Sequence, residues 1–233
     1  MLTVTHNIKE FRTAFHALVN SEIPAITAMA LNDSAYDGLD AVRDEMTQNF
    51  NSPTRWTLNA FMVWRANART LRAEVKERPS VGSRHYLKVQ MAGGARPRTG
   101  VEGALISRLQ YGGHITAVTP ASGAKLDASG NWSSGQRNQL MSGIKAQRDT
   151  LANTTARSRK RNPKRAQYFV PKPGSKLSPG VWQRDGDKVT KILHFTQSRP
   201  NYTKRVDFYK AIEVKAGLVY ERHFARRLAA AVR

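Results

Sequence analysis

Apolar residues recur every three or four positions over much of the first fifty residues, which is the spacing of one face of a helix. The stripe consists of Ala28, Leu31, Ala35, Leu39, Val42, Met46 and Phe50. It predicts an amphipathic helix over residues 21–50, with Ser21 as its N-cap and Pro24 in its first turn. Asn51-Ser52-Pro53 ends it. A helix of this length must bury its apolar face against other parts of the fold.

Two further segments have helical spacing, one at each end of the chain. The N-terminal segment carries Ile8, Phe11, Phe15, Leu18 and Val19. The C-terminal segment, from about Phe208 to Val232, has an apolar face made of Ile212, Ala216, Val219, Tyr220, Phe224, Leu228 and Ala231. Shorter helices are predicted over 101–109 and 137–151.

Alternating patterns between the long helices predict strands. They occur over 56–63, 71–75 and 167–170, and again on both sides of Asp185-Gly186. Asp-Gly between two apolar runs is typical of a β-hairpin. The fold class predicted is therefore α+β, with a modest antiparallel sheet flanked by long N-terminal and C-terminal amphipathic helices in a single domain over 1–233. Within it, 166–233 would hold a strand, the hairpin and the last helix, with a core of Trp182, Phe195, Phe208 and Phe224.

The net charge of +21 is unevenly distributed. Residues 1–50 carry three Lys/Arg and seven Asp/Glu, so the remaining chain carries +25. Such a surplus of positive charge indicates an anionic partner, most often nucleic acid or an acidic protein surface.

The densest charge lies in a predicted basic loop inserted over residues 152–165. Six of the nine residues from Arg157 to Arg165 are basic: Arg157, Arg159, Lys160, Arg161, Lys164 and Arg165. The loop could neutralise phosphates, or it could simply be a solvated segment. Because no aromatic residue interrupts this run, contact with a duplex backbone is favoured over base stacking. Arg96 and Arg98 mark a second exposed basic turn after Gly93-Gly94.

The sequence offers little for catalysis. The absence of cysteine excludes thiolate chemistry, and the six histidines have no metal-site spacing, so neither a cofactor nor a metal is expected. No nucleophile or phosphate-loop motif occurs. A metal-dependent nuclease would need paired carboxylates, and Asp185 and Asp187 are better explained as turn residues. No apolar run is long enough to span a membrane, and no signal peptide is recognisable, so synthesis in the cytoplasm is expected.

Several segments, in this order, resemble the minor tail protein Z family and related tail-completion or neck proteins of tailed bacteriophages. They are Ile-Pro-Ala-Ile-Thr-Ala-Met-Ala-Leu-Asn at 23–32, Thr54-Arg55 with 70–75, and His85-Tyr86-Leu87 before Gly93-Gly94-Ala95-Arg96. The pattern continues with Pro179-Gly180-Val181-Trp182-Gln183-Arg184, the hairpin, and Tyr202-Thr203-Lys204-Arg205-Val206-Asp207-Phe208 before the last helix. The resemblance implies a curved sheet with flanking helices, and a non-enzymatic virion subunit that joins the tail to a DNA-filled head as part of a ring.

A ring requires contacts between different surfaces of neighbouring copies. The acidic helix and the basic remainder of the chain offer such a pair. Asp33, Asp37, Asp40 and Asp44 are therefore expected to face basic residues of an adjacent subunit or of a portal-side protein. The eight basic side chains named above are expected to face DNA or an acidic partner. The alternatives are a free DNA-binding protein without sequence preference and a nuclease.

Overall fold

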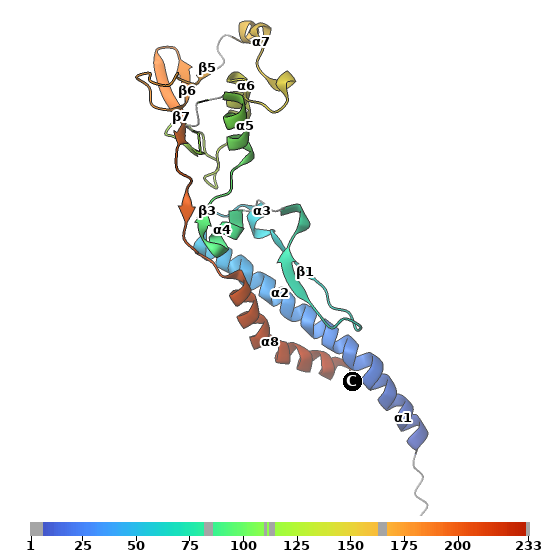
Figure 1. Ribbon diagram of the computed structural model, residues 1–233. Coiled ribbons are helices and arrows are strands. Elements are labelled where there is room, and N and C mark those ends of the chain that lie inside the picture. The colour runs from blue at the N-terminus through green and yellow to red at the C-terminus, as the bar shows by residue number, and fades with distance from the viewer. Residues whose placement is uncertain (1–6, 82–85, 110, 112–114, 163–166, 232–233) are drawn as a thin grey trace, which may run out of the picture. The chain divides into compact units, whose positions relative to one another are not determined.

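The computed structural model of the chain describes residues 7–81, 86–109, 111, 115–162 and 167–231. It has the predicted α+β composition, with long helices near both ends and small antiparallel sheets (Figure 1). The chain, expected to form a single domain, divides into two compact units. The helical unit comprises residues 1–85 and 204–233, and the sheet unit comprises residues 86–203.

One nearly continuous helical segment opens the helical unit. It consists of α1 (Ile8–Ala17), the π-helical turn η1 (Leu18–Glu22) and α2 (Ile23–Asn49). No helix begins at Ser21, where the sequence predicted an N-cap. Ser21 lies instead within the widened π-helical turn, in which the Ile23 N–H donates to the Leu18 carbonyl. Pro24 explains the widening, because proline has no N–H to donate and its ring clashes with the carbonyl of an ordinary α-turn.

The two long helices pack against each other and form the centre of the helical unit. The partner of α2 is α8 (Phe208–Ala231). Their backbones come close at Gly38, where an added Cβ would lie 3.2 Å from Ile212 Cγ2. Five residues of the predicted apolar stripe are buried, with Val42 and Met46 fully enclosed, whereas Leu31 and Phe50 are half-buried. The predicted helix at the C-terminus is confirmed as well.

A two-stranded sheet packs against α2. It pairs β1 (Phe61–Trp64) with β2 (Glu74–Glu77). The buried Asn32 side chain of α2 accepts from the Ala66 N–H at 2.7 Å and donates to the Ala66 carbonyl at 3.0 Å. The strand predicted around Trp56 is instead a short helix, α3 (Arg55–Leu58), because the Thr54 side chain caps the N–H of Thr57. A 3₁₀ turn, η2 (Pro79–Val81), follows β2.

The sheet unit contains a four-stranded antiparallel sheet in the order β4-β7-β6-β5. Its strands are β4 (Ala117–Pro120), β5 (Gln167–Phe169), β6 (Gly180–Asp185) and β7 (Lys188–Thr196). The predicted hairpin is confirmed, with Gly186 at φ 58° in the turn between β6 and β7. A second pair joins β3 (Gly94–Ala95) to β8 (Asn201–Tyr202).

Helices complete the sheet unit and close its core. They are α4 (Tyr86–Ala92), α5 (Gly100–Leu109), α6 (Ser134–Gly143), the 3₁₀ turn η3 (Thr150–Ala152) and α7 (Ala156–Arg161). The prediction over 101–109 is confirmed by α5, whereas the helix predicted over 137–151 begins and ends earlier, as α6. Leu105, Leu140 and Val181 are fully buried in this core.

The division into two units separates residues that were predicted to share one core. Phe195 is buried in the sheet unit, where its ring meets Tyr111 edge-on with centroids 5.4 Å apart. Phe208 is buried in the helical unit against Phe61. The prediction that these aromatic residues share one core is therefore wrong. The Tyr111–Phe195 pair belongs to the core of the sheet unit, and the Phe61–Phe208 pair belongs to the core of the helical unit. No helix among the described residues is long and apolar enough to cross a membrane.

Candidate nucleic-acid interface

The positive charge of the chain is concentrated in the sheet unit. Residues 86–203 contain 20 Lys/Arg and 5 Asp/Glu, whereas the rest of the chain contains 18 and 12. A unit with this excess attracts polyanions over several ångströms, with a strength that falls as salt rises. The sheet unit is therefore the part of the chain suited to bind an anionic partner.

Residues 157–161 of the basic run lie in a helix, α7, where an extended loop was predicted. The Thr155 hydroxyl caps it by accepting from the Ser158 N–H at 3.1 Å. Arg159, Lys160 and Arg161 lie in its last turn, where cations stabilise the negative end of the helix dipole. The cap and the dipole together explain why a segment of like charges is helical.

Four of the predicted DNA-facing side chains are brought together on α7. Arg157, Arg159, Lys160 and Arg161 are all exposed. Across the described ranges, no ion pair engages any of them. Lys164 and Arg165 lie outside the described residues. The helix therefore displays four exposed cations that form no ion pair with a described carboxylate.

The two arginines of the predicted basic turn have different environments. Arg98 is exposed, as expected. Arg96 is not free for DNA, because its guanidinium bonds the Glu102 carboxylate and keeps only 18% of its side-chain surface exposed. The expectation that Arg96 faces an external partner is corrected accordingly: its partner is within the sheet unit.

Glu102 is the most enclosed carboxylate among the described ion pairs, with 2% of its side chain exposed. It also accepts from the Thr99 N–H at 2.7 Å, the Thr99 hydroxyl at 2.9 Å and the Val118 N–H at 2.8 Å. Burial alone would raise the pKa of Glu102, but these bonds and Arg96 outweigh it, so the pKa lies below its ordinary value. The charged carboxylate thus fixes α5 to β4.

We expect Glu102→Ala to destabilise the sheet unit by about 3–5 kcal/mol, because it leaves Arg96 and two backbone N–H groups without their acceptor. Because the folded pKa is lowered, the stabilisation is present above the unfolded pKa and is lost as pH falls through the folded pKa. Urea unfolding of both proteins between pH 7 and pH 3 measures this. An acid-induced loss of stability that is identical in wild type and variant would contradict it.

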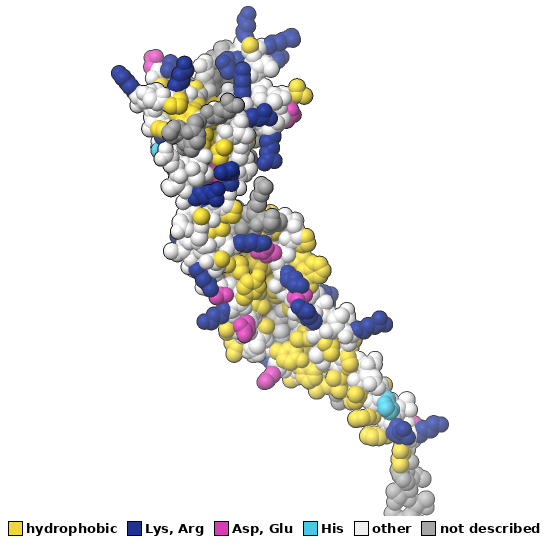
Figure 2. Space-filling model, viewed as in Figure 1, with side chains coloured by type: hydrophobic (Ala, Val, Ile, Leu, Met, Phe, Trp, Pro, Cys, Tyr) yellow, Lys and Arg dark blue, Asp and Glu magenta, His cyan; other side chains and the backbone are white. Residues whose placement is uncertain are grey.

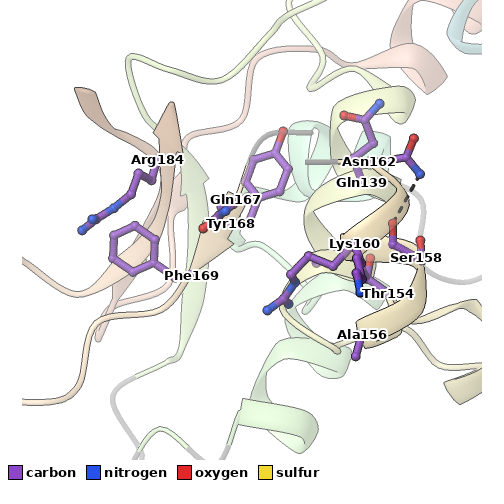
Figure 3. Close-up of a pocket in the computed structure, with 12 residues that line it drawn as sticks. Gln139, Thr154, Ala156, Ser158, Lys160, Asn162, Gln167, Tyr168, Phe169 and Arg184 are labelled. Atoms are coloured by element: carbon purple, nitrogen blue, oxygen red, sulfur yellow. Dashed lines mark hydrogen bonds between the residues drawn. The ribbon is translucent and has the colours of Figure 1, made fainter. Parts of the chain in front are cut away.

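A pocket lies between α7 and the strands β5 and β6, with a volume of about 680 Å³. Figure 3 shows Lys160, Ser158 and Asn162 on the helix side, and Phe169 and Arg184 on the strand side. Gly143 of α6 closes the wall near Tyr168, since a Cβ there would lie 3.3 Å from that ring. The pocket thus combines cations with an aromatic ring, a combination that the basic run alone lacks.

Of the four aspartates of α2 that were expected to face a neighbouring subunit, two have partners within the chain instead. The Asp33 carboxylate accepts two hydrogen bonds of 2.9 Å from Arg227 and one of 2.9 Å from Arg226. Asp37 bonds the buried His223 at 2.8 Å. These two carboxylates therefore face α8 of the same chain.

Asp40 and Asp44 remain on the exposed surface of α2. Asp40 pairs with Arg43 one turn along, at 2.7 Å, and keeps 66% of its side chain exposed. Asp44 is exposed. Of the four carboxylates predicted to meet a neighbouring subunit, these two are the ones available to it.

No cluster of His, Asp or Glu that could hold a metal ion occurs in the part of the chain that the structure describes. Asp185 and Asp187, the candidates for a nuclease, flank Gly186 at the tip of the hairpin. Asp185 there lies opposite Lys188 in the strand register. Their position is that of turn residues, as the sequence indicates.

No family model matches the chain, and no curated protein or solved structure is significantly similar to it.

Proposed function

We propose that the protein is a structural component of a bacteriophage virion at the head–tail junction. It would join the tail to the DNA-filled head as one subunit of a ring, without enzymatic activity or a cofactor. The observation that carries the proposal is the segregation of two kinds of surface: uncovered apolar helix faces in the helical unit and unpaired cations in the sheet unit. Together with the resemblance of the sequence to tail-completion proteins, this segregation favours a subunit that binds its own copies through one unit and contacts DNA through the other.

The apolar face of α1 and η1 supports self-association. Ile8, Phe11 and Phe15 of α1 and Val19 of η1 recur at helical spacing and are 57%, 69%, 54% and 42% exposed. Figure 2 shows the hydrophobic side chains along this end of the helical unit. Single exposed apolar residues are ordinary, but a continuous stripe with two stacked phenylalanines marks an interface. The exposed Asp40 and Asp44 add the charge that a basic neighbour would complement.

The cations of α7 support contact with DNA. They are exposed and form no ion pair with a described carboxylate, on a unit with a large positive excess, which suits the phosphates of a duplex. Contact of this kind positions a protein on DNA without reading its sequence. That is what a subunit lining a DNA passage requires. Virion proteins of this kind would be made and assembled in the host cytoplasm.

We expect the double change Phe11→Ser/Phe15→Ser to abolish self-association while leaving both units folded. The two rings contribute no buried contacts to the helical unit, so their removal should affect only contacts between copies. Sedimentation velocity at increasing protein concentration measures this. Leu151→Ser is the matched control, since Leu151 is 91% exposed on the sheet unit. Unchanged assembly of the double variant would contradict the assignment of α1 as the contact face.

The second candidate is a free DNA-binding protein without sequence preference, and the exposed cations of α7 favour it specifically. The two functions differ in stoichiometry. A monomer that binds duplex DNA with full, strongly salt-dependent affinity would support the second candidate. A closed ring, or a chain found in purified virus particles, would support the first.

A further inference from the structure

We propose that the pocket between α7 and strands β5–β6 binds one unpaired nucleotide of a DNA strand, with its phosphate against Arg159 and Lys160 and its base against Phe169. This inference rests on the proposed contact with DNA and adds the form of DNA recognised. The evidence is the shape of the pocket, its charge and its aromatic wall.

The size and shape of the pocket fit a nucleotide. Its volume of about 680 Å³ lies within the range of small-ligand sites. Its two walls come from different elements, α7 on one side and β5–β6 on the other, so a ligand can be held from two sides (Figure 3). The exposed cations of α7 can contact a duplex backbone, but a base within a duplex is stacked between its neighbours and cannot enter a recess.

The charge of the pocket suits a phosphate. Arg159 and Lys160 line it from α7, and Arg184 lines it from β6. No carboxylate is among its lining residues in the described part of the chain. An arginine fork and a lysine ammonium are the groups that bind phosphate oxygens, the first by paired hydrogen bonds and the second as a point charge.

The strand side of the pocket suits a base. The Arg184 guanidinium lies 5.9 Å from the centroid of the half-buried Phe169 ring. Bases stack on aromatic rings and on guanidinium planes regardless of their identity. Gln167 of β5 lines the same side, and its amide can hydrogen-bond a base edge. The basic run contains no aromatic residue, and the pairing of β5 with β6 supplies one.

Fluorescence anisotropy with three labelled probes tests the proposal on the full chain. The probes are a blunt duplex, the same duplex with a short single-stranded overhang, and a single-stranded oligonucleotide. We expect the overhang to bind more tightly than the blunt end, and Phe169→Ala to weaken overhang and single-strand binding about 10- to 100-fold while leaving blunt-duplex binding nearly unchanged. Tyr209→Ala, which removes an exposed ring from α8, is the control.

A second variant separates stacking from packing. Phe169→Leu keeps an apolar side chain but has no π face, so it should lose the same preference at an unchanged melting temperature. Equal binding of the overhang by wild type and both variants would overturn the proposal. So would thymidine monophosphate competing as strongly as the overhang, because the site would then serve a free nucleotide. A wild-type protein that binds the blunt duplex but does not prefer the overhang would refute the pocket alone. Failure of ring assembly with an intact overhang preference would refute the proposed function alone.

Discussion

Replacing Arg157, Arg159, Lys160 and Arg161 together by glutamine should weaken duplex binding on the order of 100-fold at low salt. Each cation that contacts a phosphate releases condensed counterions. The change should therefore also reduce the salt slope, which is the steepness of the plot of log K for binding against log salt concentration, by up to about 3–4. Glutamine preserves the helical preference of α7, so the fold should be retained. Anisotropy titrations with a blunt duplex at several salt concentrations give both quantities.

A matched charge change elsewhere separates local contact from net charge. Lys9, Arg12, Lys210 and Lys215 are exposed on the helical unit, and replacing them by glutamine removes the same charge. We expect this control to keep most of the affinity and nearly all of the salt slope. Equal losses in the two variants would show that the overall charge, and not the surface of α7, attracts DNA.

Phe208→Ala should destabilise the helical unit by about 3–5 kcal/mol. Phe208 is fully buried, and its ring meets Phe61 edge-on with centroids 5.3 Å apart. The change therefore leaves a cavity where the start of α8 meets the sheet that covers α2. Hydrogen exchange read peptide by peptide measures the effect in each unit: exchange should accelerate in α2 and β1, and remain unchanged in β6 and β7.

The adjacent Tyr209 provides the control for this change. Its ring is 66% exposed, so Tyr209→Ala should shift the stability of the helical unit by less than about 1 kcal/mol. Accelerated exchange in both units of the Phe208 variant would show that the two cores unfold together, against the division described above.

The elements predicted correctly are those specified by neighbouring residues. The apolar stripe of α2, the Asp-Gly hairpin and the final helix all depend on periodicity or on turn residues a few positions apart. A loop was predicted where α7 forms because a run of like charges repels itself. The Thr155 cap and the helix dipole at the last turn outweigh that repulsion, and both of these signals are present in the sequence.

The pairings between distant residues could not be predicted. Asp33 and Arg227 are 194 positions apart, and only the packing of α2 on α8 brings them within hydrogen-bonding distance. Asp37 finds the buried His223 in the same way. Two of the acidic side chains of α2 are therefore bonded to α8 of the same chain. The spacing of apolar residues along the sequence does not predict these partners.

The pocket illustrates the same limit for the candidate site. Arg159 and Lys160 were identified from the basic run, whereas Phe169 and Arg184 join them only through the pairing of β5 with β6. The pattern over 167–170 indicated a strand but not what lies beside it. Arg96 was predicted to be available for the same reason, because the sequence does not place Glu102 against it.

Antibody labelling of purified virus particles tests the proposed function most directly. Particles would be prepared from a host and virus that carry this gene, labelled with an antibody raised against the sheet unit, and imaged by electron microscopy. We predict label confined to the junction of head and tail, and the chain present in the particles by mass spectrometry. Absence of the chain from particles, with all of it in the soluble fraction of the infected cell, would contradict the proposal.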